Sequence, residues 1–224
     1  MLLQVQNLIG EEHLKKLDRL LGKAKYIEGG KTAPAMIAHV KNNLQVDREK
    51  TKEIGDIDQL ILTALWQSPV IKAACLPVRA FQPSINRHEP GMSFGAHTDS
   101  PVIGANPPMR ADIAVSVFLS DPGSYEGGDL IVKTESGEAR FKLPRGHALI
   151  YPGGAIHAVE KVTSGVRLAA VTWLQSAVRD SQKRQILVEL DMARGLTVKN
   201  NPDSDESRLL MKVYGNLFRM WGDL

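Results

Sequence analysis

From residue 78 onward the chain breaks into short runs rich in β-branched and aromatic residues, and this texture constrains the fold most strongly. The runs are VRAFQPSINRH, DIAVSVFLS, GDLIVKT, ARFKL, HALIYP and RLAAVTWLQS, and turns rich in Gly, Pro, Ser and Asp separate them. Six or more short strands punctuated in this way are typical of an antiparallel sandwich or barrel, such as a jelly roll. A doubly wound fold is not expected, because no glycine fingerprint for a nucleotide lies between a strand and a helix.

Helical periodicity flanks this β-rich middle on both sides. Before it, residues 8–22 and 53–67 carry apolar residues at helical spacing, whereas the polar segment VKNNLQVD between them predicts an exposed loop. After it, residues 177–193 and 205–221 each predict an amphipathic helix, the first with Ile186, Leu187 and Leu190 on one side. We expect these last helices to cover the sheet or the first helices, or to form a subunit interface.

Together these patterns predict an α+β fold in three parts. Residues 1–77 would be a region of helices and strands that packs on the core, residues 78–177 the jelly-roll domain, and residues 178–224 a helical extension at the C-terminus.

Composition excludes several function classes. The net charge is only +3, with 28 basic and 25 acidic residues interspersed, so we expect no dedicated nucleic-acid surface. No apolar run approaches the roughly 20 residues of a membrane span, and the N-terminus lacks the features of a signal peptide. The one cysteine, Cys75, lies in an apolar run and predicts a buried, inert thiol. A cytoplasmic protein is expected.

Three side chains of metal-ligand type stand at suggestive spacing. His97 and Asp99 are two residues apart, so in an extended segment they point to the same side. His157 follows about sixty residues later, at the end of YPGGAIH, and would complete the set if its strand lies beside the first. Two histidines and one carboxylate on one face are the ligands of non-haem Fe(II) oxygenases. Taken singly, an H-x-D pair is a weak signal and a lone histidine a weaker one.

Arg167 opens the run RLAAVTWLQS and shares a strand face with Ala169, Val171 and Trp173. An arginine on an apolar face is expected to be at least partly buried, and a buried guanidinium needs an anionic partner. A carboxylate of 2-oxoglutarate would suit it, with the keto acid end of the same molecule chelating the iron. The plainer alternative is a salt bridge within the protein.

Motifs along nearly the whole chain resemble the bacterial PKHD-type hydroxylases, a branch of the Fe(II)/2-oxoglutarate dioxygenases that are similar to prolyl and lysyl hydroxylases. The resemblance rests on VKNNLQVD, NRHEPGMSFGAHTD, PPMRADIAVSVFLSDPGSYEGGDL, KLPRGHALIYP, IHAVEKVTSGVRLAAVTWLQS and VRDSQKRQILVELD. It implies a double-stranded β-helix, Fe(II) held by His97, Asp99 and His157, and 2-oxoglutarate bound by Arg167. It also implies O2 as oxidant, L-ascorbate as the usual reductant, and a role in iron homeostasis.

One position, His88, differs from the pattern of the PKHD-type hydroxylases. Relatives usually carry Tyr where this chain has His88, and in the wider superfamily that tyrosine often contacts the co-substrate. His88 could donate a hydrogen bond to 2-oxoglutarate, line the pocket or have no role in binding. No catalytic residue beyond the metal ligands is predicted.

The expected activity couples oxidative decarboxylation of 2-oxoglutarate, to succinate and CO2, with hydroxylation of a second substrate. That substrate could be a small molecule such as an iron chelator, or a protein side chain. A nucleic-acid demethylase is disfavoured, because the second arginine of that group is missing. A non-catalytic sensor of iron and 2-oxoglutarate, and a metal-free structural jelly roll, are the alternatives from other classes.

Two polar segments could belong to the same site. Residues 100–112, SPVIGANPPMRAD, follow the first ligands directly and could close over the substrate, or simply connect two strands. VKNNLQVD could line the entrance. The sequence also leaves open a homo-oligomer.

Overall fold

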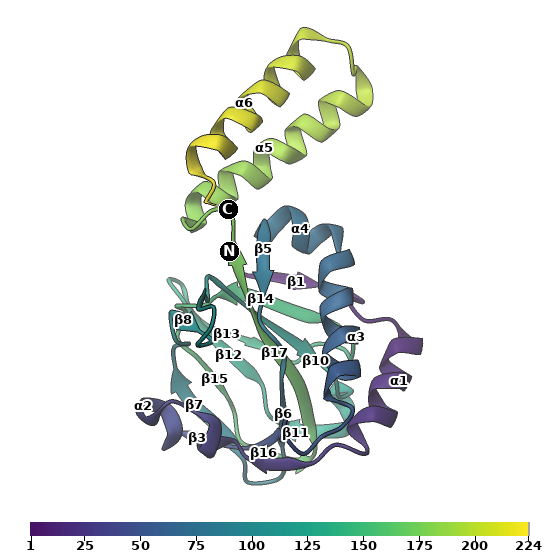
Figure 1. The fold of residues 1–224 in the computed structure, drawn as a ribbon, viewed down its shortest axis with the longest axis vertical. Helices are drawn as coiled ribbons and strands as arrows, with labels where there is room; N and C mark the ends of the chain where they lie inside the picture. Colours follow the sequence, from purple (N-terminus) through teal and green to yellow (C-terminus); the bar gives the residue numbers. More distant parts are fainter. Residues whose placement is uncertain (224) are drawn as a thin grey trace.

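Two facing antiparallel β-sheets form the core of the computed structural model, which describes residues 1–223 (Figure 1). The larger sheet has the order β1 (Leu3–Val5), β14 (Ala148–Pro152), β10 (Ile113–Phe118), β17 (Arg167–Ser176), β6 (Ser84–His88), β4 (Leu44–Val46) and β2 (Tyr26–Glu28), with β5 (Pro77–Ala80) also paired to β17. The smaller sheet has the order β13 (Gly137–Phe141), β12 (Leu130–Thr134), β15 (His157–Val159), β7 (Ser93–His97) and β3 (Lys41–Asn42). This architecture is the predicted jelly roll.

Two small ribbons complete the strands. One pairs β11 (Tyr125–Gly127) with β16 (Val162–Gly165), and the other pairs β8 (Val102–Ile103) with β9 (Met109–Arg110). The second ribbon lies within the segment 100–112 that follows the first candidate ligands.

Side chains of the central strand β10 alternate between the two faces of the larger sheet and contribute to a hydrophobic core on each face. Ile113, Val115 and Val117 point to the helices, whereas Ala114 and Phe118 point into the space between the sheets. Because successive residues of a strand face opposite sides, a strand that is apolar throughout is buried on both faces. The predicted strand at Arg167–Ser176 is confirmed as β17, and it alternates in the same way.

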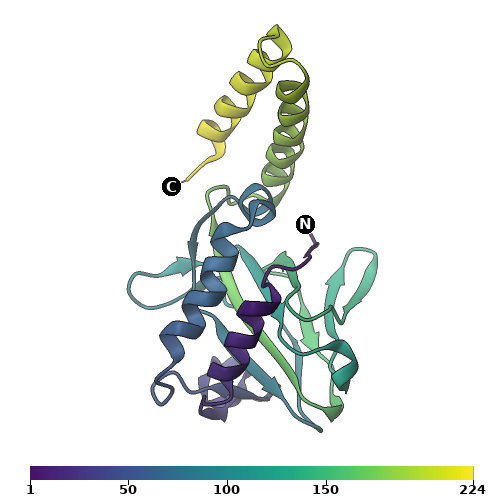
Figure 2. The same cartoon turned by 90° about the vertical axis from the view of Figure 1, so that its right-hand side faces the viewer.

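Three helices cover the outer face of the larger sheet (Figure 2). They are α1 (Glu11–Leu21), α3 (Ile54–Gln67) and α4 (Pro69–Cys75). The short helix α2 (Ala35–Ala38) and the 3-10 turns η1 (Gly29–Thr32) and η2 (Pro122–Ser124) lie in connections. The helical periods at residues 8–22 and 53–67 are therefore confirmed as α1 and α3. Cys75, at the end of α4, is fully buried, and burial raises the pKa of its thiol to about 12.

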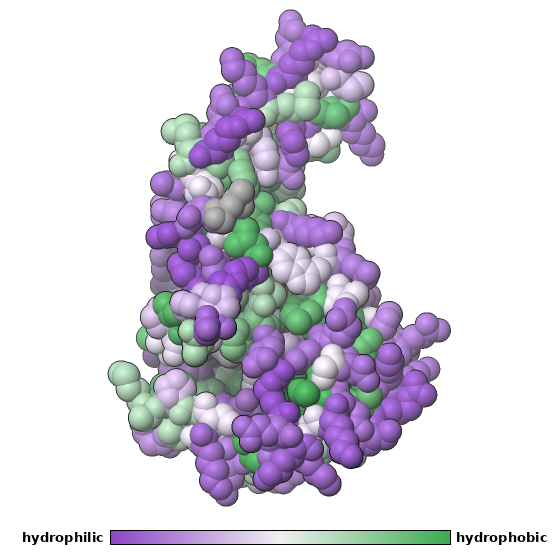
Figure 3. Space-filling model, in the orientation of Figure 1, coloured by the Kyte–Doolittle hydropathy of each residue, from purple (hydrophilic) through white to green (hydrophobic). Residues whose placement is uncertain are grey.

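The last two helices form a hairpin that projects from the body of the protein (Figure 1). These helices are α5 (Ser181–Asn200) and α6 (Asp205–Trp221), and α5 packs on α4 at its base. The hairpin does not cover the sheet, and Ile186, predicted on the packed side of α5, is 47% exposed while Leu187 is fully buried. The surface in Figure 3 is largely hydrophilic, with hydrophobic side chains visible on the hairpin and where it meets the body.

The prediction that VKNNLQVD forms an exposed loop is wrong. Residues 41–42 form β3, which pairs with β7, and residues 44–46 form β4, which lies between β2 and β6. The segment therefore contributes the edge strand β3 to the smaller sheet and the inner strand β4 to the larger one, and residues 1–77 supply strands as well as covering helices. Among the helices of residues 1–223, none combines the length and apolarity needed to cross a bilayer.

Candidate metal centre and its cavity

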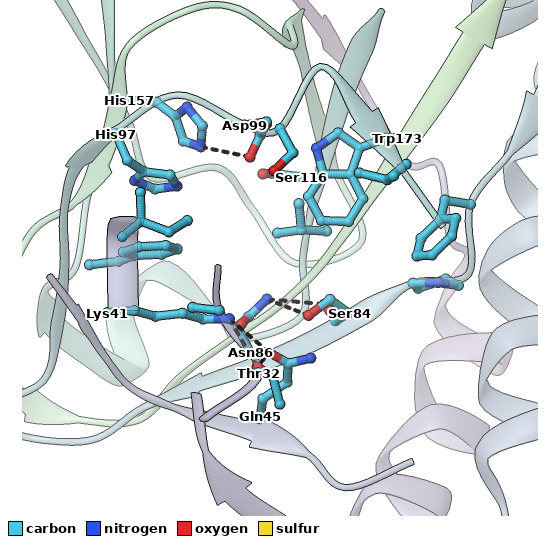
Figure 4. A pocket seen from close by; sticks show the side chains of 18 of the residues that line it. Thr32, Lys41, Gln45, Ser84, Asn86, His97, Asp99, Ser116, His157 and Trp173 are labelled. Atoms are coloured by element: carbon cyan, nitrogen blue, oxygen red, sulfur yellow. Dashed lines mark hydrogen bonds and ion pairs between the residues drawn. The ribbon is translucent and has the colours of Figure 1, made fainter. Parts of the chain in front are cut away.

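The two candidate histidines lie opposite each other on neighbouring strands. His97 ends β7 and His157 begins β15, and the two are register partners in the smaller sheet, with ring centroids 4.3 Å apart. Asp99 follows β7, and its Oδ1 lies 3.8 Å from His157 Nε2. One ligand atom from each of these residues lies within 4.8 Å of the other two. The spacing predicted from the sequence is thus realised as one compact cluster (Figure 4).

Backbone carbonyls hold both imidazoles in the orientation that a metal needs. His97 Nδ1 donates to the carbonyl of Gly95 at 2.8 Å, and His157 Nδ1 donates to the carbonyl of Ala155 at 3.0 Å. With Nδ1 occupied, the lone pair of each Nε2 is free for a ligand. Burial and the neighbouring His157 lower the pKa of His97 to about 4, so its imidazole is neutral at pH 7.

The carboxylate of Asp99 carries an unsatisfied acceptor. Its Oδ2 is buried and has no hydrogen-bond partner within residues 1–223. A buried acceptor without a partner is costly and points to a group that normally occupies it. Two imidazoles and one carboxylate form the donor set of ferrous sites, so these residues fit an Fe(II) ion.

Arg167 lies on the wall of the same cavity, which has a volume of about 420 Å³. It is 2% exposed and pairs in register with His88 of β6. Within the part of the chain that the structure describes, no carboxylate lies within 4.0 Å of its guanidinium, and its Nε has no hydrogen-bond partner. Burial accordingly lowers the pKa of Arg167. The salt-bridge alternative from the sequence is not what the structure shows.

His88 is the second unsatisfied group beside Arg167. It is 1% exposed, and neither ring nitrogen has a hydrogen-bond partner among residues 1–223. Burial and the positive charges of Arg167 and Lys41 lower the pKa of His88 to about 3. A neutral imidazole with one N–H to donate therefore faces the cavity next to the guanidinium.

Aromatic residues enclose this end of the cavity. Phe118 lies under Arg167, with its ring centroid 5.5 Å from the guanidinium carbon. Burial raises the pKa of Tyr125, against the opposite influence of the Arg167 charge, so its phenol is neutral at pH 7. Tyr151 also lines the cavity, with its ring 5.0 Å from the His157 ring and its hydroxyl 3.3 Å from Ser116 Oγ.

Glycine at position 128 allows the chain to pass over the arginine. Gly128 has a φ of +70°, and a β-carbon there would lie 3.1 Å from Arg167 Cδ and 3.1 Å from Tyr125 Cε2. A larger residue would displace both side chains.

The structure thus brings all five predicted site residues to one cavity: His88, His97, Asp99, His157 and Arg167. Tyr151 and Lys41 line the same cavity and Tyr125 lies beside Arg167, and none of the three was predicted individually from the sequence, although VKNNLQVD, which contains Lys41, was expected to line the entrance. Tyr151 could have been found from HALIYP, because it alternates in phase with Leu149 on the inner face. Part of segment 100–112 also lines the cavity, through Val102, Ile103 and Gly104, whereas its closing over a substrate stays a prediction.

Comparison with protein families gives two matches. Residues 83–175 match the model of the 2OG-Fe(II) oxygenase superfamily, and residues 180–223 match the PKHD-type hydroxylase C-terminal domain. The first match contains the whole candidate cluster, and the second covers the α5–α6 hairpin.

Curated relatives match the chain from end to end. A PKHD-type hydroxylase of Thioalkalivibrio sulfidiphilus is 41% identical over 225 residues, covering 100% of both chains. One from Rippkaea orientalis is 36% identical over 222 residues, covering 99% of this chain and 100% of the other.

Solved structures of distant proteins share the fold. A prolyl hydroxylase of Trichoplax adhaerens, in complex with a peptide fragment of the hypoxia-inducible factor, aligns with a TM-score of 0.54 at 12% identity and covers 83% of this chain and 86% of its own. HygX of Streptomyces hygroscopicus, with nickel and 2-oxoglutarate bound, aligns with a TM-score of 0.53 at 13% identity, covering 78% and 82%.

Proposed function

The chain belongs to the PKHD-type hydroxylases of the 2OG-Fe(II) oxygenase superfamily, and from that premise we propose that His97, Asp99 and His157 hold its ferrous ion while Arg167 binds 2-oxoglutarate. The protein is an Fe(II)- and 2-oxoglutarate-dependent dioxygenase that uses O2. The observation that carries the residue assignment is the cluster of three ligand atoms beside a buried arginine without an acidic partner.

When bound, the ferrous ion supplies the redox chemistry that couples the decarboxylation of 2-oxoglutarate to succinate and CO2 with hydroxylation of a second substrate. The protein supplies the three ligands, with the His97 imidazole neutral at pH 7. The carbonyls of Gly95 and Ala155 fix the tautomers of both histidines, and Asp99 offers a carboxylate oxygen that nothing else occupies.

The co-substrate end is built to hold a carboxylate away from water. Arg167 offers a fixed fork of N–H donors that suits a carboxylate bidentately, and its burial strengthens the attraction. We assign His88 to the same carboxylate, as a neutral N–H donor at the place where relatives carry a tyrosine hydroxyl. Tyr125 lies near Arg167, and both side chains fit there because Gly128 has no β-carbon.

L-Ascorbate as reductant and a cytoplasmic location complete the proposal. Family resemblance supports the first, and a single buried cysteine that can form no internal disulfide is consistent with the second.

The test is succinate release that depends on both Fe(II) and 2-oxoglutarate. Asp99→Ala removes the carboxylate ligand, so we expect release to fall to the level of the metal-free protein. Glu135→Ala, at the exposed turn between β12 and β13, is the matched control and should retain the activity. Undiminished succinate release by Asp99→Ala would contradict the ligand assignment.

A further inference from the structure

A second polar wall faces the ligand cluster across the cavity (Figure 4). The cluster of His97, Asp99 and His157 lies at one end, and the opposite side is lined by Thr32, Lys41, Gln45, Ser84 and Asn86. Neither the metal nor the 2-oxoglutarate assignment uses these residues.

Lys41 is the only full charge of that wall, and its neighbours within the described chain are neutral. Its Nζ donates to Gln45 Oε1 at 2.8 Å and to Thr32 Oγ1 at 3.4 Å. No carboxylate of residues 1–223 lies within 4.0 Å of it. The nearby Arg48 is different, because it forms an ion pair with Asp58.

One aromatic ring separates Lys41 from the candidate metal ligands. The ammonium lies 5.6 Å from the centroid of the Phe94 ring, and that ring stacks on His97 at 3.7 Å. A group held by Lys41 is therefore close enough to the cluster for the rest of the same molecule to reach it.

The charge of Lys41 is incompletely compensated. Burial lowers its pKa to about 8, which leaves it mostly protonated at pH 7. An ammonium that is partly withdrawn from water and has no anionic partner is unfavourable, and an anion that binds beside it reduces that penalty.

The charges in a cavity that holds Fe(II) and 2-oxoglutarate indicate which charge the substrate should carry. The two charges of Fe(II) balance the two of 2-oxoglutarate, and the Asp99 carboxylate balances Arg167. One positive charge is then left, on Lys41. A substrate group with a single negative charge neutralises it, whereas a phosphate at about −2 would overshoot.

The remaining wall is apolar. Trp173 and Phe81 meet edge to face, with centroids 6.2 Å apart, and Val102 and Ile103 of the segment after the first ligands lie on the same cavity. A molecule that fits this space has one anionic end and an apolar body.

On the basis of the proposed function, we propose that Lys41, positioned by Gln45 and Thr32, binds a carboxylate of the primary substrate, whose apolar body lies against Trp173 and Phe81. The substrate class is thereby a small carboxylic acid with an aromatic or aliphatic body. The carboxylate anchors the molecule on the side of the cavity opposite the metal and directs the body toward the ligand cluster.

Binding measurements without turnover test the subsite. The anaerobic protein is loaded with Fe(II) and saturating 2-oxoglutarate, and ligand-observed NMR follows benzoate, phenylacetate, 3-phenylpropanoate and 4-phenylbutanoate, each against its amide. We expect at least one acid to bind about tenfold or more tightly than its amide, since a hydrogen bond between two charged groups is stronger than one to a neutral group.

Three variants locate the preference. Lys41→Met should bring the ratio of acid to amide affinity close to one, Lys41→Arg should keep most of it, and the exposed Lys133→Met should leave it unchanged. The 2-oxoglutarate affinity should be retained in all three.

No preference for any acid, or an undiminished preference in Lys41→Met, would overturn the inference. A selective loss of 2-oxoglutarate binding in Lys41→Met would also overturn it, because Lys41 would then belong to the co-substrate site. Failure of the proposed function looks different, since the wild-type protein would then not bind 2-oxoglutarate in the same samples.

Discussion

At the scale of single residues, the site consists of buried polar groups without partners. Arg167 lacks an acidic partner, both nitrogens of His88 are unpaired, and so is Oδ2 of Asp99, within residues 1–223. Folding a protein with several such groups on one cavity is unfavourable unless ligands satisfy them. The proposed metal and acidic co-substrate would occupy the Asp99 oxygen, the Arg167 guanidinium and the one N–H of His88.

Gly128→Ala should weaken 2-oxoglutarate binding without touching any ligand. Its β-carbon would lie 3.1 Å from the side chains of Arg167 and Tyr125, and its φ of +70° is strained for alanine. We expect a loss of about 1–3 kcal/mol in stability together with a higher Kd for 2-oxoglutarate, measured by anaerobic titration. Gly123→Ala is the control, because a β-carbon there meets no atom within 4 Å. Unchanged 2-oxoglutarate affinity in Gly128→Ala would contradict the packing described.

His88 should make the metal-free protein less stable in acid. Its pKa is about 3 when folded and near 6.5 when unfolded, so between these values only the unfolded chain binds the proton. Stability is therefore fully present above pH 6.5 and is lost as the pH falls, by on the order of 2 kcal/mol at pH 5.

Urea denaturation as a function of pH measures this effect. His88→Phe should reduce the slope between pH 7 and 5, leaving the part that His97 contributes through its own pKa of about 4, whereas His13→Gln, on the exposed surface of α1, should leave the slope intact. An identical slope in His88→Phe would show that His88 does not contribute to it.

At the scale of elements, what could be predicted follows from local periodicity. α1 and α3 were predicted because apolar residues repeat there at helical spacing, and the structure buries Leu14, Leu17 and Leu21 of α1 and Ile57, Ile61 and Leu65 of α3. The strand β17 and its two faces were predicted because alternation is also local.

What could not be predicted depends on partners distant in the chain. β3 pairs with β7 and β4 with β6, more than forty residues away, and their own residues lack a clear alternation. Lys41 was expected in an exposed loop for that reason, although the structure places it on the cavity wall. The C-terminal helices were predicted from amphipathicity, which does not specify the partner; α5 packs on α4, and α5 and α6 pack on each other.

The start of α5 offers a test at this scale. Asp180 accepts hydrogen bonds from the backbone N–H groups of Gln182 and Lys183, which lowers its pKa and caps the helix. Asp180→Ala should speed amide hydrogen exchange in the first turns of α5 and leave the sheets unaffected. Asp180→Asn preserves an acceptor and should exchange almost as slowly as the wild type. Exchange at the wild-type rate in Asp180→Ala would show that the cap does not hold α5.

At the scale of the whole molecule, each of the two sheets contributes a different part of the site. The smaller sheet presents both candidate histidines on neighbouring strands, and the larger sheet presents Arg167 and His88 across the same cavity. The helices on the outer face stabilise the larger sheet from behind, because its central strands are apolar on both sides. The site therefore depends on the sheets facing each other, with Asp99 added from the segment that follows β7.

The central claim is that these two walls bind Fe(II) and 2-oxoglutarate together. Anaerobic titration of the protein with both, followed through the charge-transfer absorption of the chelate, tests it most directly. The wild-type protein should develop the band. His157→Ala should fail to develop it, and Arg167→Met should require at least about 30-fold more 2-oxoglutarate, as expected for losing one partner of a buried charge pair. A wild-type protein without the band, or variants that match it, would contradict the account.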